Sequence, residues 1–174
     1  SVMKKEYVDN DENKNVMLTI DKDIQSKIKD ILASEYCEPY KQVGVVLMEA
    51  DTGKIRALVQ KDDSKPNVNL GVASNNGFFA GSIFKVITEE AGLSAGIIDL
   101  DKFYVHNKKY ADGTVEEQHI KISEGLARSC NDVFYEVGKE VGFEHIKDMA
   151  KRQGMLSKVL GLECEVGGNI EVNE

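Results

Sequence analysis

The sequence predicts a mixed α/β (α+β) fold, in which a hairpin of two antiparallel strands is joined to a group of helices. Two β-rich runs, residues 43–48 and 54–59, flank the turn segment Glu49-Ala50-Asp51-Thr52-Gly53. Several later segments place apolar residues three and four positions apart, which is the spacing of one helix face. The chain has 174 residues, of which 41% are hydrophobic, so it can bury a core.

The composition excludes several classes of function. Thirty acidic residues against 22 Lys and Arg give a net charge of −8. Such a chain lacks the clustered cations that bind nucleic acid or an anionic membrane, so we expect no nucleic-acid partner. No apolar run approaches the roughly 20 residues that a transmembrane helix needs. The three cysteines and three histidines are widely and irregularly spaced, which predicts no disulfide framework, no metal site and no cofactor.

The first third of the chain predicts a strand, a helix and the hairpin. Residues 1–15 are charged and predict a linker or frayed terminus, and residues 16–20 predict a short strand. Asp21 is placed to cap a helix, because apolar residues follow it with helical spacing at positions 24, 28, 31 and 32. This helix should end before Pro39. Gly53 can supply the positive φ that the hairpin turn needs.

The rest of the chain predicts mainly helices. A polar loop over residues 60–80 precedes a helix at 82–95 that Gly81 and Gly96 flank. The Asp112-Gly113 pair marks the turn of a small hairpin. Three short helices follow, at residues 122–128, 131–141 and 144–153. The Gly-rich tail, residues 156–174, predicts no closing element.

Ser82 and Lys85 are spaced for nucleophilic catalysis. They put a hydroxyl and an amine three residues apart, so that on a helix both lie on one face. A serine needs a neighbouring base to act as a nucleophile, and a partly desolvated lysine can be that base. The same spacing at Ser26 and Lys29 predicts no chemistry, because that pair falls in the middle of an amphipathic helix. Ser82 instead follows a long loop, where catalytic residues are often found.

A second candidate is the segment Ser129-Cys130-Asn131, which lies between two predicted helices. A hydroxyl and an amide at such a junction can point into one cleft. Serine and asparagine are also good helix N-caps, so capping of the helix from residue 131 is the alternative interpretation.

Four segments together resemble the transpeptidase domain of penicillin-binding proteins. Residues 16–25 and 44–58 resemble the opening of that domain. Gly81-Ser82-Ile83-Phe84-Lys85 resembles its nucleophile motif, and Ser129-Cys130-Asn131 resembles its Ser-x-Asn motif. Because the segments follow the family's order, residues 16–174 are identified as a partial penicillin-binding transpeptidase domain.

The resemblance implies a β-lactamase/transpeptidase-like fold, an α/β sandwich with a helical subdomain. It also implies a peptidoglycan D,D-transpeptidase, acylated by the D-Ala-D-Ala end of a stem peptide or by penicillin and other β-lactams. Ser82 would be acylated and Lys85 would act as the base. Ser129 would pass a proton to the leaving group, and Asn131 would hold the substrate amide. The parent protein would lie at the extracytoplasmic face of the bacterial cell membrane, with its anchor outside this chain.

One motif of the family is missing. Neither Lys-Thr-Gly nor Lys-Ser-Gly occurs in the sequence, although in the family this motif lies on a central strand after the Ser-x-Asn helix. We therefore expect an incomplete domain with little transpeptidase activity of its own. The hairpin of residues 43–59 would then leave an apolar sheet edge, which we expect to pair with a second copy or with a C-terminal fragment.

Two other functions fit the same motifs. A β-lactam-sensing domain would also be acylated at Ser82 but would keep the acyl group as a signal, so transfer to an amine acceptor distinguishes the two. A catalytically inactive scaffold or interaction module of the same fold would lose only stability in a Ser82→Ala variant.

Overall fold

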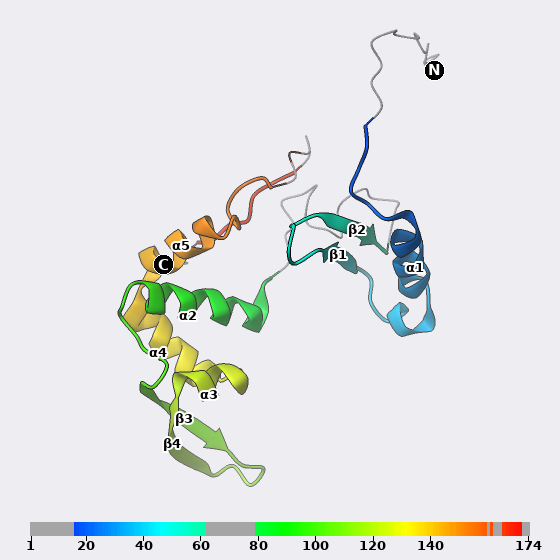
Figure 1. Ribbon diagram of the computed structural model, residues 1–174. Helices are drawn as coiled ribbons and strands as arrows, with labels where there is room; N and C mark the ends of the chain where they lie inside the picture. The colour runs from blue at the N-terminus through cyan, green and yellow to red at the C-terminus, as the bar shows by residue number, and fades with distance from the viewer. Residues whose placement is uncertain (1–15, 62–78, 160, 162–164, 172–174) are drawn as a thin grey trace, which may run out of the picture. The chain divides into compact units, whose positions relative to one another are not determined.

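The computed structural model describes residues 16–61, 79–159, 161 and 165–171. The chain divides between residues 70 and 71 into two compact units (Figure 1). The predicted linker at 1–15 and most of the predicted loop at 60–80 lie outside the described residues. Each unit has its own hydrophobic core.

The first unit is an antiparallel hairpin with one helix against it. Strand β1 (Gly44–Met48) pairs with β2 (Ile55–Gln60), which confirms the predicted hairpin. Gly53 has a φ of 70° in the turn between them, as the turn chemistry requires. A short 3₁₀ helix, η1 (Glu35–Cys37), follows the α-helix that the structure describes in this unit.

Helix α1 (Lys22–Leu32) begins where the sequence predicts. The Asp21 carboxylate accepts hydrogen bonds from the backbone N–H groups of Asp23 and Ile24, which is the geometry of an N-cap. The helix packs on β2, and the small core that results contains Leu32, Ala57 and Val59.

The predicted strand at residues 16–20 is wrong. These residues are described, and they form no strand. The Thr19 side chain donates to the carbonyl of Ile55, and the Asp21 N–H donates to the carbonyl of Arg56, but no continuous ladder follows. Apolar residues in a row were the only sequence signal, and a strand also needs a partner along its length.

Strand β1 keeps apolar side chains at the surface of the structure. Val46, Leu47 and Met48 are 57%, 42% and 60% exposed. Pairing of this edge with a second copy or a fragment stays a prediction.

The second unit is built around helix α4 (Asn131–Val141). Its buried face consists of Val133, Phe134, Val137 and Val141, the four residues that the periodicity selects. Packed around it are α2 (Phe84–Ser94), β3 (Phe103–Lys109), α3 (Ile122–Ala127) and α5 (Phe143–Arg152). The strand β4 (Val115–Lys121) pairs with β3 and completes the predicted small hairpin. Gly142, at a φ of 81°, ends α4.

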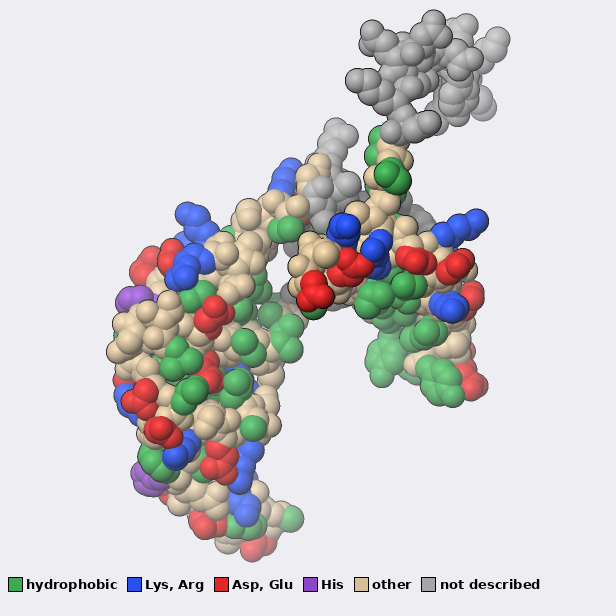
Figure 2. All heavy atoms as spheres, in the orientation of Figure 1, with side chains coloured by type: hydrophobic (Ala, Val, Ile, Leu, Met, Phe, Trp, Pro, Cys, Tyr) green, Lys and Arg blue, Asp and Glu red, His purple; other side chains and the backbone are tan. Residues whose placement is uncertain are grey.

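The surfaces of both units mix charged and apolar side chains (Figure 2). Among the described residues, no helix has the length and apolar character that crossing a membrane requires. The candidate site residues Ser82, Lys85, Ser129 and Asn131 all lie in the second unit.

Candidate active site

The amine of Lys85 connects the residues of both predicted motifs. Lys85 Nζ lies 2.6 Å from Asn131 Oδ1, 2.7 Å from the Ser129 carbonyl oxygen and 3.1 Å from Ser129 Oγ. It lies 3.3 Å from Ser82 Oγ. The structure thus brings together all four residues that the sequence selects, although 44 residues separate Lys85 from Ser129.

The amine of Lys85 contacts two kinds of oxygen. Its two shortest contacts go to oxygens that only accept, the Ser129 carbonyl and the Asn131 amide oxygen. It also donates to Ser129 Oγ and Ser82 Oγ, so both hydroxyl groups lie within hydrogen-bond distance of the same nitrogen. This is the geometry that proton transfer between an amine and a hydroxyl requires.

Ser82 is positioned by a tight turn in front of α2. A 3₁₀ helix, η2 (Gly81–Ile83), runs directly into α2, and Gly81 has a φ of 59°. In a 3₁₀ turn, side chains three positions apart lie above one another, which explains why Ser82 and Lys85 meet. An added Cβ at Gly81 would meet no described atom within 4 Å. The positive φ, and not a lack of space, therefore explains why glycine occupies this position.

Ser129 holds a conformation that favours glycine. Helix α3 ends in a Schellman motif, in which the Cys130 N–H bonds to the Gly125 carbonyl and the Ser129 N–H bonds to the Leu126 carbonyl. The residue at this corner usually is glycine, because its backbone is left-handed. Ser129 has a φ of 54°, and it is the one non-glycine residue with a positive φ in the described part of the chain. Such strain concentrates at functional sites.

Asn131 does not serve as a helix cap. The cap position of α4 is Cys130, and no side chain among the described residues caps this helix end. The Asn131 amide oxygen instead accepts a hydrogen bond from Lys85. The capping interpretation of this segment is therefore wrong. Asn131 also lines an open groove of about 950 Å³ between β3 and α4, where a ligand could reach the amide.

Contacts at both ends of α4 fix it to β3. At the far end, Glu140 accepts a hydrogen bond from the Tyr104 hydroxyl at 2.8 Å and pairs with Lys102. The bond from Lys102, followed by the bond from Tyr104, lowers the pKa of Glu140. Burial, followed by the bond to Glu140, raises the pKa of Tyr104. These contacts hold the far end of α4 against the residues at and just before the start of β3.

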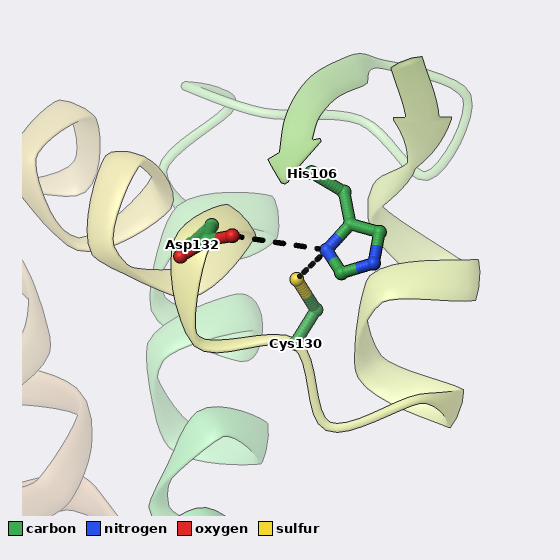
Figure 3. Close-up of side chains that lie close together, drawn as sticks. All are labelled: His106, Cys130 and Asp132. Carbon is green, nitrogen blue, oxygen red and sulfur yellow. Dashed lines mark hydrogen bonds and ion pairs between the residues drawn. The ribbon is translucent and has the colours of Figure 1, made fainter. Parts of the chain in front are cut away.

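The near end of α4 holds a cluster that the sequence did not reveal. Cys130 Sγ lies 2.9 Å from His106 Nδ1, and the Asp132 carboxylate lies beside the same nitrogen (Figure 3). His106 and Cys130 are 24 residues apart, so their spacing gave no hint of this contact. One sequence signal did exist. Tyr104 and His106 are two positions apart on β3, so their side chains point to the same face of the strand, and this face meets α4.

Most of this chain is similar to known proteins. A family model described as the penicillin binding protein transpeptidase domain matches residues 43–172. Peptidoglycan D,D-transpeptidase PbpA of Mycobacterium tuberculosis is 27% identical over 81% of this chain and 36% of its own length. The chain thus spans little more than a third of this relative.

Two solved structures show the same fold. A peptidoglycan glycosyltransferase from Burkholderia ambifaria aligns with a TM-score of 0.70 at 17% identity, over 90% of this chain and 51% of its own. Penicillin-binding protein A from Mycobacterium tuberculosis, solved as an imipenem acyl-enzyme complex, aligns with a TM-score of 0.63 at 23% identity, over 86% and 42%. Both confirm the predicted transpeptidase-like α/β fold. Because the family model covers most of its residues, this chain belongs to the family of penicillin-binding protein transpeptidase domains.

Proposed function

We propose that this chain is the part of a peptidoglycan D,D-transpeptidase that carries the acylated serine, and that Ser82 is this serine. The observation that carries the proposal is the position of Lys85 Nζ, within 3.3 Å of Ser82 Oγ and 3.1 Å of Ser129 Oγ. One amine, the base, then contacts both the nucleophilic hydroxyl and a second hydroxyl, which is the arrangement that acyl transfer through a serine ester needs.

Each of the four residues has a distinct role in the proposed reaction. Lys85 takes the proton from Ser82 Oγ as this oxygen attacks the carbonyl carbon of the substrate. When the C–N bond breaks, the Ser129 hydroxyl gives its proton to the departing amine and takes one from the protonated Lys85, which lies 3.1 Å away. Asn131, whose amide oxygen contacts Lys85, holds the substrate amide. The strained backbone at Ser129 supports a chemical role, because glycine would fit that corner better but would lack the hydroxyl.

The substrate class is the D-Ala-D-Ala end of a peptidoglycan stem peptide, with β-lactams as mimics of that group. Family membership and the imipenem acyl-enzyme of the Mycobacterium tuberculosis protein support this choice. Peptidoglycan lies outside the cytoplasmic membrane, so we place the active protein at the extracytoplasmic face.

Labelling with fluorescent penicillin tests the nucleophile in the protein at its full natural length. Ser82→Ala should abolish the label, and Lys85→Ala should slow acylation by about 10²- to 10⁴-fold because the base is lost. Ser26→Ala is the matched control, since Ser26 and Lys29 have the same spacing within α1. That variant should label as the wild type does. Label that survives in Ser82→Ala would refute the assignment.

A second assay separates a transpeptidase from a β-lactam sensor. The acyl-enzyme formed from a D-Ala-D-Ala thioester analogue is offered a D-amino acid, and the transfer product is measured by mass spectrometry. A transpeptidase forms the product, and Ser82→Ala forms none. An acyl-enzyme that forms but never transfers its acyl group would favour the sensor instead.

A further inference from the structure

Three side chains with metal-binding atoms meet beside the Ser-x-Asn turn. His106 Nδ1, Cys130 Sγ and a carboxylate oxygen of Asp132 all lie within 4.8 Å of one another. Figure 3 shows His106 reaching from β3 toward Cys130 in the turn and Asp132 in the first turn of α4. The fold brings together an imidazole, a thiol and a carboxylate, three of the groups that zinc takes as ligands.

The distances suit a metal centre with little rearrangement. Cys130 Sγ lies 2.9 Å and Asp132 Oδ2 lies 3.8 Å from His106 Nδ1. Zinc bonds of roughly 2.0–2.3 Å in a tetrahedral arrangement put ligand atoms about 3.3–3.6 Å apart. Side-chain rotations that move these atoms by less than about 1 Å bring both separations into that range. The third pair, Cys130 Sγ and the Asp132 carboxylate oxygen, lies within 4.8 Å and must also approach when the ion binds.

From this geometry we infer that His106, Cys130 and Asp132 form a zinc site with water as its fourth ligand. A thiolate and a carboxylate together balance the charge of the ion, and the soft sulfur favours zinc over magnesium or calcium. On binding, the Cys130 thiol loses its proton to solvent, and Nδ1 of the neutral His106 ring donates its lone pair. The side chain of Asp132 is 47% exposed, which leaves an entry path for the ion.

The surrounding backbone already orients the ligands. Asp132 Oδ2 accepts a hydrogen bond from the Asn107 N–H at 3.1 Å, so the strand that carries His106 also holds the carboxylate. The Cys130 N–H bonds to the Gly125 carbonyl at 2.8 Å, and Cys130 is only 6% exposed. Cys130 is also the N-cap residue of α4, where the helix dipole stabilises an anionic ligand.

The zinc site has a structural role. Because Cys130 stands between Ser129 and Asn131, an ion that joins it to His106 ties the Ser-x-Asn turn to strand β3. The turn then keeps the strained backbone of Ser129 in place. This role rests on none of the catalytic assignments, and metal binding is measurable in the absence of any acylation.

A Co²⁺ titration of the purified, metal-free chain tests the site. Co²⁺ bound by a thiolate absorbs in the near ultraviolet, and Zn²⁺ should displace it and remove the band. Cys130→Ser should lose the band, and His106→Ala and Asp132→Asn should weaken Co²⁺ binding by about tenfold or more. Cys37→Ser and His145→Ala are the matched controls, and both should bind as the wild type does. A band that persists in Cys130→Ser would overturn the proposal.

A measurement on the wild-type chain guards against variants that fail to fold. Zn²⁺ should slow alkylation of Cys130 by iodoacetamide, as followed by peptide mass spectrometry, and should leave Cys37 unchanged. Mg²⁺ at the same concentration should protect neither residue. Equal alkylation of Cys130 with and without Zn²⁺ would mean that the three side chains only hydrogen-bond, and the zinc site would be abandoned.

Discussion

The left-handed backbone of Ser129 leads to a prediction in which stability and catalysis respond differently to two similar variants. Ser129→Ala and Ser129→Gly both remove the hydroxyl and its 3.1 Å contact with Lys85. They differ at the backbone, because alanine must keep the φ of 54° whereas glycine adopts it freely. The difference in stability between these two variants therefore isolates the strain at this corner.

The size of the effect follows from two opposing contributions. A residue with a Cβ loses about 1–2 kcal/mol in the left-handed region, whereas glycine costs about 0.5–1 kcal/mol in additional chain entropy. Ser129→Gly should therefore exceed Ser129→Ala by about 0.5–1 kcal/mol in the free energy of unfolding. For a chain of this size, that corresponds to a difference of about 1–4 °C in Tm.

Urea and thermal unfolding, followed by far-ultraviolet circular dichroism, measure this difference. Gly138 provides the control, because it lies within α4 and an added Cβ there meets no described atom within 4 Å. At that position alanine should be the more stable residue, by about 0.5–1 kcal/mol. If Ser129→Ala proves as stable as Ser129→Gly, the backbone of Ser129 is not strained. If Ser129→Gly labels with penicillin as fast as the wild type, the hydroxyl relays no proton.

Three further predictions concern the interior of the second unit. Gly92→Ala should lower the free energy of unfolding by about 1–3 kcal/mol, because the new Cβ would lie 2.6 Å from an isoleucine side chain, and a neutral effect in urea unfolding would contradict this packing. Burial raises the pKa of the Glu89 carboxyl above 4.5, so the folded chain holds this proton more tightly than the unfolded chain and loses stability as the pH rises. Glu89→Met should therefore be more stable than the wild type near pH 7 and lose that advantage as the pH falls toward 4.5, whereas a Tm difference independent of pH would disprove the argument. Tyr104→Phe removes the bond to Glu140 and should lower the free energy of unfolding by about 0.5–1.5 kcal/mol; unchanged urea unfolding would show that this bond contributes nothing.

Local chemistry made much of the fold predictable from sequence. Asp21 caps α1, Gly53 turns the first hairpin and Gly142 ends α4, and in each case the signal and the structure lie within a few residues. The four buried residues of α4 followed equally from their spacing. The strand expected at residues 16–20 was wrong because strand formation depends on a partner distant in sequence.

Some contacts of the candidate site are predictable from local sequence and others are not. The contact between Ser82 and Lys85 follows from their spacing, because one turn brings them together. The contact between Lys85 and Asn131 does not, since an amide at a helix start can either cap the helix or bind a distant amine, and the sequence contains both options. The cluster of His106 with Cys130 depends on how β3 meets α4. The alternation along β3 predicts which face His106 shares with Tyr104, but it does not predict which element packs on that face.

The division of the chain between residues 70 and 71 places all four candidate site residues within one compact unit. Every contact described for Ser82, Lys85, Ser129 and Asn131 comes from residues of the second unit. The core of the first unit, where α1 packs on β2, contains none of these four residues. The reacting groups therefore depend for their mutual geometry on the folding of the second unit, and variants of that unit are where changes in the contacts of the amine should be sought.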